Sequence, residues 1–380
     1  GLVFCNPYYE KIKNMKILHV INNLTEIGGA EKMLANLVNA SQNDEIMIIS
    51  LLDYDQELVE RIFNDKNLTI KAIKLNKTTL LANIFELKKT INAFNPDIIQ
   101  TWMYASNVIV SLVNLIFFQK WSIFWGIHHS LAKLSAEKKS TLKMISLSKL
   151  LSKQPKAIIY CSEECLTQHN NFGFHPVNGF VILNGHPMQE VNHYKLHDSF
   201  CIGMAGRFHK VKDWQNGIEA VYLFAKQFPE QKIKLIAVGQ DIVDSNEELM
   251  EYAKNLLELP NVVIELKGVC KNMHEFYKQI DLFVLSSISE DLPNVLCESI
   301  SYGIPCIGTD VGGVKSIIDG IYKVVPASNT PALSNAIKEF FAEDSNKKLD
   351  ISNQAFQRAK KLFDINSSYQ KYNQVWQEKK

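Results

Sequence analysis

The spacing of two basic residues in one segment suggests a site for an anionic ligand. Arg207 and Lys212 lie within residues 203–214, after an apolar run that reads as a strand and before a run that reads as a helix. A guanidinium and an ammonium held on such a strand-to-helix loop can neutralise a diphosphate without a metal ion, because both donate strong hydrogen bonds to phosphate oxygens. The alternative is a solvated basic loop, in which Lys210 would be equivalent to Lys212.

Two glutamates follow the apolar run at residues 282–285. Glu290 is expected in the loop after this strand, and Glu298 in the helix that follows, among apolar neighbours. A carboxylate accepts two hydrogen bonds at once, so it can hold the vicinal hydroxyls of a ribose or hexose. A carboxylate buried in a helix needs such partners. Glu290 could instead be an exposed loop acid.

Two features of the N-terminal half could approach a ligand. Gly28 and Gly29 follow the first strand and open a helix, where glycine allows close approach of the backbone. The pattern is not Gly-x-Gly-x-x-Gly, so it does not favour a nicotinamide dinucleotide, and alone it could be an ordinary turn. His128 and His129 end another strand, and adjacent strand residues point in opposite directions. At most one of them therefore faces the ligand side, and either could be a structural polar residue.

Strands and helices that alternate along the chain would position these residues. Such alternation predicts parallel sheets with crossover helices, arranged as two doubly wound α/β domains that face a cleft at the carboxyl ends of their strands. The Asn-Gly pair at residues 184–185 marks a linker. We expect an unstructured extension at 1–14, an N-terminal domain at 15–184, a linker at 185–198, a C-terminal domain at 199–365 and a final helix at 366–380. The predicted strands are 16–22, 45–51, 68–73, 97–101, 122–128, 157–161, 201–205, 233–238, 262–264, 282–285 and 305–308.

Bulk composition narrows the class of protein. The 380 residues carry a formal net charge of +1, which gives no indication of a nucleic-acid partner. The seven cysteines are scattered without metal-site spacing, which favours buried thiols in a reducing cytoplasm. Residues 1–14 do not resemble a secretory signal. The apolar run 105–118 is shorter than the roughly 20 residues that span a bilayer, so we interpret it as a buried helix.

Taken in order, several segments resemble glycosyltransferase family 4. The segments are 28–31, 182–185, 206–207 with 212–213, Glu290 with Glu298, 303–305 and 309–313. The resemblance runs from residue 15 to residue 313. It implies a GT-B fold and transfer of a sugar from a nucleotide donor with retention of anomeric configuration, and a final helix that returns to the first domain. UDP-sugars are favoured, GDP-sugars are an alternative, and the acceptor would be a glycan or a lipid-linked glycan in surface polysaccharide synthesis.

The resemblance also implies roles for individual residues. Arg207 and Lys212 would hold the donor diphosphate, Glu298 the ribose hydroxyls and Glu290 the hexose. Gly28 and Gly29 would lie against the donor phosphates or the acceptor, and His129 near the transferred sugar. The implied catalytic set is Arg207, Lys212, Glu290 and His129, and the implied donor-binding set is Gly28, Gly29, Gly206, Arg207, Lys212, Glu290, Asp291, Leu292, Pro293, Asn294 and Glu298. Asp291 stands where the family usually has glycine, which could alter sugar recognition.

The expected reaction uses no metal and no cofactor. A metal-dependent transferase would have Asp-x-Asp after a strand of the donor half, whereas Asp53-Tyr54-Asp55 lies in the first half. Two alternatives stay open: a nucleotide-sugar epimerase of the same fold, which needs more acid and base groups around the sugar, and a catalytically silent nucleotide-sugar-binding protein. A donor that is turned over, rather than only bound, would exclude the silent protein.

A strongly basic stretch follows His129. Residues 131–156 contain seven lysines, from Lys133 to Lys156, and one acid, Glu137. Apolar residues lie between the lysines, so a basic amphipathic helix could rest on an anionic membrane surface. The alternative is an ordinary solvated helix. We therefore expect a cytoplasmic protein that can be peripheral on the inner membrane.

Overall fold

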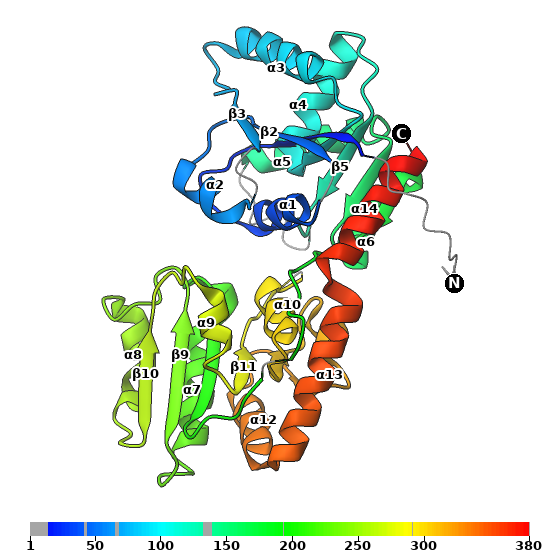
Figure 1. Ribbon diagram of the computed structural model, residues 1–380. Coiled ribbons are helices and arrows are strands. Elements are labelled where there is room, and N and C mark those ends of the chain that lie inside the picture. The colour runs from blue at the N-terminus through cyan, green and yellow to red at the C-terminus, as the bar shows by residue number, and fades with distance from the viewer. Residues whose placement is uncertain are drawn as a thin grey trace, which may run out of the picture. The chain divides into compact units, whose positions relative to one another are not determined.

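A computed structural model describes residues 14–41, 44–64, 68–131, 139–192, 194–290 and 292–379 (Figure 1). The chain divides into two compact units. Unit 1 contains Gly1–Ile182 together with Tyr369–Lys380, and unit 2 contains Leu183–Ser368. Each unit is a parallel sheet with helices on both faces, as the alternation of strands and helices predicts.

Unit 1 is built on seven parallel strands in the order β3-β2-β1-β4-β5-β6-β7. All six strands predicted in this half are present, with ends shifted by at most two residues, and β7 is additional. The side chains of the central strands β4, β5 and β6 are all buried, because helices cover both faces of a parallel sheet, whereas no residue of the edge strands β3 and β7 is fully buried. The strands are β1 (Lys16–Ile21), β2 (Glu45–Ser50), β3 (Thr69–Ala72), β4 (Ile98–Trp102), β5 (Ile123–Ile127), β6 (Ala157–Tyr160) and β7 (Gly179–Val181).

Three helices of unit 1 pack into one hydrophobic cluster on the same face of this sheet. Leu87, Val110 and Ile145 represent α3, α4 and α5 in that cluster. The run predicted as a buried helix is α4; the prediction holds for one face of the helix, whereas Leu112, Leu115 and Ile116 are exposed. No helix in the described part of the chain is long and apolar enough to cross a membrane. The helices are α1 (Gly29–Ala40), α2 (Gln56–Ile62), α3 (Leu80–Phe94), α4 (Met103–Ile116), α5 (Lys139–Leu151) and α6 (Glu163–Phe172).

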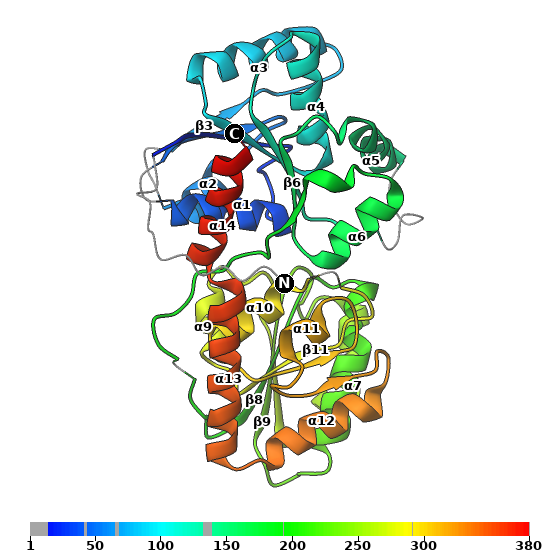
Figure 2. The ribbon, with the colours of Figure 1, turned by 90° about the vertical axis from the view of Figure 1, so that its right-hand side faces the viewer.

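The C-terminal segment α14 (Ile365–Lys379) carries an aromatic stripe that packs within unit 1 (Figure 2). Tyr372 and Trp376 are fully buried. The Trp376 indole N–H donates to Gln100 Oε1 at 3.0 Å, and the Tyr372 ring stacks on Trp102 with 6.2 Å between centroids. The expectation that this stripe packs on other parts of the protein is confirmed.

Unit 2 contains six parallel strands in the order β10-β9-β8-β11-β12-β13. The five predicted strands of this half are present, and β13 is additional. The strands are β8 (Phe200–Ala205), β9 (Ile233–Val238), β10 (Val262–Leu266), β11 (Leu282–Leu285), β12 (Cys306–Thr309) and β13 (Val324–Val325). The helices are α7 (Trp214–Ala225), α8 (Glu247–Leu257), α9 (Met273–Tyr277), α10 (Asn294–Ser301), α11 (Val314–Ile318), α12 (Thr330–Ala342) and α13 (Ser345–Phe363).

The order of strands places a topological switch point at β8. This strand pairs with β9 on one side and with β11 on the other, so the chain leaves β8 and β11 in opposite directions. In open α/β sheets, ligands bind in the crevice that forms at the carboxyl ends of such a strand pair. The two loops concerned, after β8 and after β11, are those that carry the predicted cations and Glu290.

The segment expected to be a linker, 185–198, groups with unit 2 and is held there by specific contacts. The Tyr194 hydroxyl donates to the Asp281 carbonyl at 2.9 Å, and Asn192 Nδ2 donates to Ser352 Oγ at 2.8 Å. At its start, the His186 N–H donates to the Phe363 carbonyl at 2.7 Å. The segment is therefore anchored along its length, as its buried Tyr194 indicates.

The described cysteines carry free thiols. Five of them, at positions 161, 165, 201, 297 and 306, are buried, and Cys270 is half-buried. Burial raises the pKa of Cys201 to about 11, so this thiol stays protonated at neutral pH. The interpretation of the cysteines as buried thiols is confirmed for these five, whereas Cys5 lies outside the described residues.

Candidate active site

The loops after β8 and β11 bring Lys212 and Glu290 into direct contact. Lys212 Nζ lies 2.5 Å from Glu290 Oε1, and the two side chains are only 20% and 11% exposed. Ser287 donates a hydrogen bond to the same carboxylate oxygen at 2.6 Å. Sequence analysis gave the two residues separate roles, on the diphosphate and on the hexose. The structure instead joins them into one half-buried ion pair at the switch point.

Main-chain contacts hold this pair in place. The Ile288 N–H donates to the Val211 carbonyl at 2.9 Å, and Ser286 Oγ donates to the Lys212 carbonyl at 2.9 Å. Thr309, at the end of β12, donates from Oγ1 to the Ser287 carbonyl at 2.5 Å. The two loops are thus tied to each other and to a third strand, so the positions of the charged groups are preorganised.

Gly206 and Arg207 begin the loop after β8. Gly206 has a φ of +152°, and a Cβ at the neighbouring Gly239 would lie only 1.8 Å from the Gly206 carbonyl oxygen. Glycine is required there because the two backbones touch. Arg207 is exposed, and its carbonyl accepts from the Trp214 indole N–H at 3.1 Å. Its guanidinium therefore extends from a fixed backbone into solvent, where it can reach an anion.

Glu298 is buried in α10, as predicted from its apolar neighbours. The Tyr277 hydroxyl donates to Glu298 Oε2 at 3.2 Å, which gives the carboxylate a partner. Burial and the nearby Glu298 raise the pKa of Tyr277 well above its usual range, so the phenol remains a donor. The contact fixes one oxygen of Glu298. The carboxylate can still accept from a diol because each oxygen has two lone pairs.

The residues between the two glutamates lie at the start of α10. Pro293 is its N-cap, and Asn294 Oδ1 accepts from Asn184 Nδ2 at 3.3 Å. This bond connects Asn184, of the Asn-Gly motif, to the first residue of α10 within unit 2. Leu292 is half-buried against the core of unit 2, whereas Asp291 lies outside the described residues.

The glycine pair of unit 1 opens α1, as expected. The Gly28 N–H donates to Glu31 Oε2 at 3.0 Å, and Gly28 is the N-cap of the helix. Burial raises the pKa of Glu31, while hydrogen bonds from two backbone N–H groups, its own and that of Gly28, oppose this rise. The anion position at this helix start is therefore taken by the Glu31 carboxylate. A ligand phosphate at Gly28 and Gly29 would have to displace it.

His129 lies in a chain of hydrogen bonds that sequence analysis missed. The buried His169 ring has Nδ1 at 2.7 Å from the Cys165 carbonyl, so Nδ1 carries the proton. Its Nε2, 2.7 Å from the Tyr104 hydroxyl, must then accept from Tyr104. The Tyr104 oxygen is consequently left to accept from His129 Nδ1, at 3.3 Å. This chain assigns the proton of a neutral His129 to Nδ1 and its lone pair to Nε2.

The predicted residues therefore belong to both units. Gly206, Arg207, Lys212, Glu290, Asn294 and Glu298 lie on adjacent loops and one helix of unit 2. Gly28, Gly29 and His129 lie in unit 1. Within unit 2, Lys212 and Glu290 touch, and Glu298 is one helical segment further along. Ser287, Tyr277 and Tyr104, which contact predicted residues, have no sequence signal beyond their positions after or beside strands.

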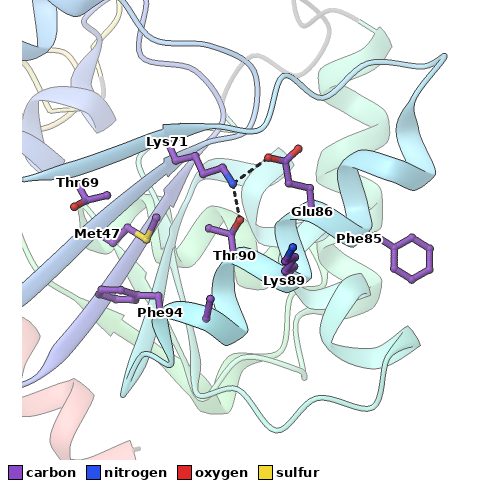
Figure 3. A pocket seen from close by; sticks show the side chains of 9 residues that line it. Met47, Thr69, Lys71, Phe85, Glu86, Lys89, Thr90 and Phe94 are labelled. Carbon is purple, nitrogen blue, oxygen red and sulfur yellow. Dashed lines mark hydrogen bonds and ion pairs between the residues drawn. The ribbon is translucent and has the colours of Figure 1, made fainter.

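Two surface cavities bear on this assignment. One of about 500 Å³ lies beside the loop after β8 and is lined by Phe208, Lys210, Asp213 and Tyr252, among others. Another of about 790 Å³ lies in unit 1 between β3 and α3 (Figure 3). There Lys71 is engaged by Glu86 at 3.0 Å and by Thr90 at 2.9 Å. None of the predicted site residues lines this second cavity.

One cluster in the described chain has metal-ligand chemistry: His197, Cys201 and Asp281. It lies where β8 and β11 begin, at the opposite end of these strands from the loops that carry Lys212 and Glu290. Asp281 accepts from His197 Nδ1 at 2.9 Å and from the Cys201 N–H at 2.7 Å. The buried Asp281 carboxylate therefore holds the segment before β8 in place.

Each half of the chain matches a glycosyltransferase family model. Residues 27–190 match the family model described as Glycosyltransferase Family 4, and residues 199–343 match the model described as Glycosyl transferases group 1. An uncharacterized glycosyltransferase of Methanocaldococcus jannaschii is 26% identical over 66% of this chain and 63% of its own length. The capsular polysaccharide biosynthesis glycosyltransferase CapM of Staphylococcus aureus is 26% identical over 46% of each chain. The chain thus aligns with less than two thirds of the length of each of these two relatives.

Solved structures share the fold over nearly the whole chain. HepE of Anabaena, in complex with UDP, aligns with a TM-score of 0.79 at 18% identity, over 96% of this chain and 100% of its own. TarM aligns with a TM-score of 0.74 at 14% identity, over 97% and 100%. With both family models matching in order, two doubly wound sheets and the expected motif residues on their loops, the chain belongs to the family 4 glycosyltransferases of the GT-B fold.

Proposed function

We propose that this protein is a retaining glycosyltransferase that moves a hexose from a nucleotide-sugar donor to a glycan or lipid-linked acceptor in surface polysaccharide synthesis. The observation that carries the proposal is the preorganised Lys212–Glu290 pair at the switch point of unit 2, with Arg207 and Glu298 on the same set of elements. A cation and a carboxylate held together there match the needs of a diphosphate linked to a polyhydroxylated sugar.

A UDP-sugar is the favoured donor. Support comes from HepE, a protein of the same fold that has been solved with UDP and with UDP-glucose. Support for the acceptor class comes from CapM, which is named for capsular polysaccharide biosynthesis. In this proposal unit 2 (183–368) binds the donor. Gly28 and Gly29 of unit 1 lie against the donor phosphates or the acceptor, and His129 lies near the transferred sugar.

The chemistry places developing charge on the leaving diphosphate while the sugar becomes oxocarbenium-like. Arg207 and Lys212 stabilise that charge: the Lys212 ammonium is preorganised by Glu290, and the Arg207 guanidinium extends from a fixed backbone. Lys212 is held by Glu290 in the structure, and the same carboxylate is positioned to accept hexose hydroxyls, so donor binding would share the lysine between Glu290 and the diphosphate. The acceptor hydroxyl would enter on the face from which the diphosphate departs, with the leaving phosphate as base.

A screen of purified protein against UDP- and GDP-hexoses tests the proposal. We expect slow hydrolysis of one donor, and transfer of its radiolabelled sugar to an added glycan acceptor. Binding without turnover of any donor would favour the catalytically silent alternative. Conversion of a donor into its epimer, without transfer, would favour the epimerase.

Activity is expected to persist in excess EDTA. The cations Arg207 and Lys212 are proposed to take the role that a divalent metal has in Asp-x-Asp transferases, and the donor half has no such motif after a strand. Initial rates of donor turnover with and without EDTA measure this. Complete loss in EDTA that manganese restores would contradict the metal-independent assignment.

Replacement of Glu298 by alanine is expected to raise the KM for the donor and to leave kcat nearly unchanged. Contacts to a ribose are similar in the ground state and the transition state, so they contribute uniform binding. Steady-state kinetics of Glu298→Ala test this. The matched control is Tyr277→Phe, which keeps the Glu298 carboxylate and removes the tyrosine hydroxyl with its hydrogen bonds to that carboxylate and to the Val295 carbonyl. A large fall in kcat at unchanged KM would assign Glu298 to the chemical step instead.

The basic stretch 133–156 is proposed to meet an anionic membrane surface. In the described part, Lys139, Lys143 and Lys153 are exposed on or just after α5, and Lys133 and Lys138 lie outside the described residues. Each lysine near such a surface contributes on the order of 1 kcal/mol, screened by salt. We expect the protein to sediment with anionic vesicles at low salt, and Lys139→Glu with Lys143→Glu to weaken this.

The control for that experiment is Lys232→Glu with Lys254→Glu, which changes the same charge on exposed positions of unit 2. Donor hydrolysis should be unchanged in both double variants. Equal sedimentation of the two double variants, or no sedimentation of the wild-type protein at low salt, would exclude α5 as a membrane contact.

A further inference from the structure

The same helical layer of unit 1 exposes large apolar side chains away from α5. The apolar ridge consists of Leu81 and Phe85 on α3, Leu112, Leu115 and Ile116 on α4, and Phe118 just after α4. Phe118 is 90% exposed, Leu81 74%, Ile116 60% and Phe85 57%. Soluble proteins rarely gather exposed apolar residues in this way unless the surface has a partner.

Contacts between α3 and the end of α4 make the ridge continuous. The Phe85 ring meets the Phe117 ring edge-on, with 5.2 Å between centroids. Asn92 Oδ1 accepts from the Trp121 indole N–H at 3.1 Å, which holds the segment after α4 against α3. Phe118 has a φ of +50°, a conformation that a bulky residue seldom adopts, and it points its ring into solvent. Phe85 also lines the rim of the cavity shown in Figure 3, so the ridge borders that cavity.

Lysines outnumber acids in the segments that carry the ridge. Residues 74–92 contain Lys74, Lys77, Lys88 and Lys89 and a single acid, Glu86, which is paired with Lys71. Residues 103–121 contain Lys120 and no acid. Lys88 Nζ lies over the Phe117 ring, 4.6 Å from its centroid, which places this charge beside the ridge. Exposed apolar residues accompanied by lysines match the acyl boundary and the anionic headgroups of a bilayer.

We infer that the apolar ridge inserts into the headgroup–acyl boundary of an anionic membrane. Helices α3, α4 and α5 cover one face of the sheet, so the outer surface of a single layer carries both the ridge and the α5 lysines. The lysines provide long-range, salt-sensitive attraction, and the ridge provides short-range, salt-resistant anchoring. The inference rests on the proposed function in one respect, because a lipid-linked acceptor would give such anchoring its purpose.

A tryptophan placed on the ridge reports insertion directly. In Phe118→Trp, the new indole should shift its emission to the blue when vesicles of phosphatidylcholine with phosphatidylglycerol are added, and brominated lipid should quench it. The matched control is Val263→Trp in unit 2, where Val263 is 58% exposed. Equal responses of the two variants would overturn the inference.

A polar ridge should lose the salt-resistant part of binding. Ile116→Ser with Phe118→Ser should lower vesicle affinity at high salt by about 100-fold or more, because each buried large apolar side chain contributes roughly tenfold. Both positions are exposed, so folding should be preserved. An unchanged affinity for vesicles would contradict the inference. A wild-type protein that binds no vesicles but forms a dimer, which the double variant loses, would also contradict it and would assign the ridge to a second copy of the chain. Donor hydrolysis is measured in parallel: its absence in the wild-type protein would refute the proposed function and leave the ridge test intact.

Discussion

Lys212→Ala is expected to lower kcat about 100-fold or more, which is the usual effect of removing one group that stabilises charge in the transition state. The substitution also leaves the Glu290 carboxylate, which is 11% exposed, with the hydrogen bond that Ser287 donates but without its positive partner. Steady-state kinetics with saturating donor measure the effect. The wild-type kcat in Lys212→Ala would contradict a role of this residue at the leaving diphosphate.

Two further variants separate charge stabilisation from simple pairing. Lys210→Ala removes an exposed lysine two positions away in the same loop and should leave kcat unchanged. Glu290→Gln removes the negative partner and keeps a hydrogen-bond acceptor. If the two residues act as a unit, the double variant Lys212→Ala with Glu290→Gln should lose less than the product of the single losses.

Trp376→Ala is expected to destabilise unit 1 by about 3–5 kcal/mol, the range for truncation of a fully buried tryptophan. Trp376 is fully buried, and its indole N–H satisfies Gln100 Oε1, which would lose this donor. Urea denaturation followed by circular dichroism measures the change. Since two units can unfold in separate steps, the transition of unit 1 should move to a lower urea concentration and the transition of unit 2 should stay.

Trp121→Ala serves as the control for that substitution. Trp121 lies in the same unit, is half-buried and bonds to Asn92 near the surface, so its loss should cost clearly less. Equal destabilisation by the two alanine variants would mean that the C-terminal aromatic stripe is not part of the core of unit 1.

The strands of both sheets could be predicted because buried parallel strands leave a strong signal. Residues 282–285 are a continuous apolar run, residues 233–238 are apolar except for Lys234, and the strands found there have those bounds. The short elements could not be predicted in the same way. β13 contains two residues, and α6 has the polar sequence 163–172, so neither has a clear period.

The candidate site was predictable as a set of residues but not as a set of contacts. Loop cations and acids after strands identify Lys212 and Glu290, yet 78 positions separate them, and only the pairing of β8 with β11 brings them together. The partners Tyr277 and Tyr104 are aromatic residues that read as ordinary core. The contact of Glu31 with the start of α1 does have a local sequence signal, because Gly28 is followed three residues later by Glu.

The anomeric configuration of the transferred sugar tests the central claim most directly. With an α-linked UDP-hexose as donor, proton NMR of the early product should show the small coupling constant of an α-glycoside, because the acceptor would enter on the face that the diphosphate leaves. Lys212→Ala should give the same product at a much lower rate. A β-linked product from the wild-type protein would show inversion and would contradict the retaining transfer proposed for this site.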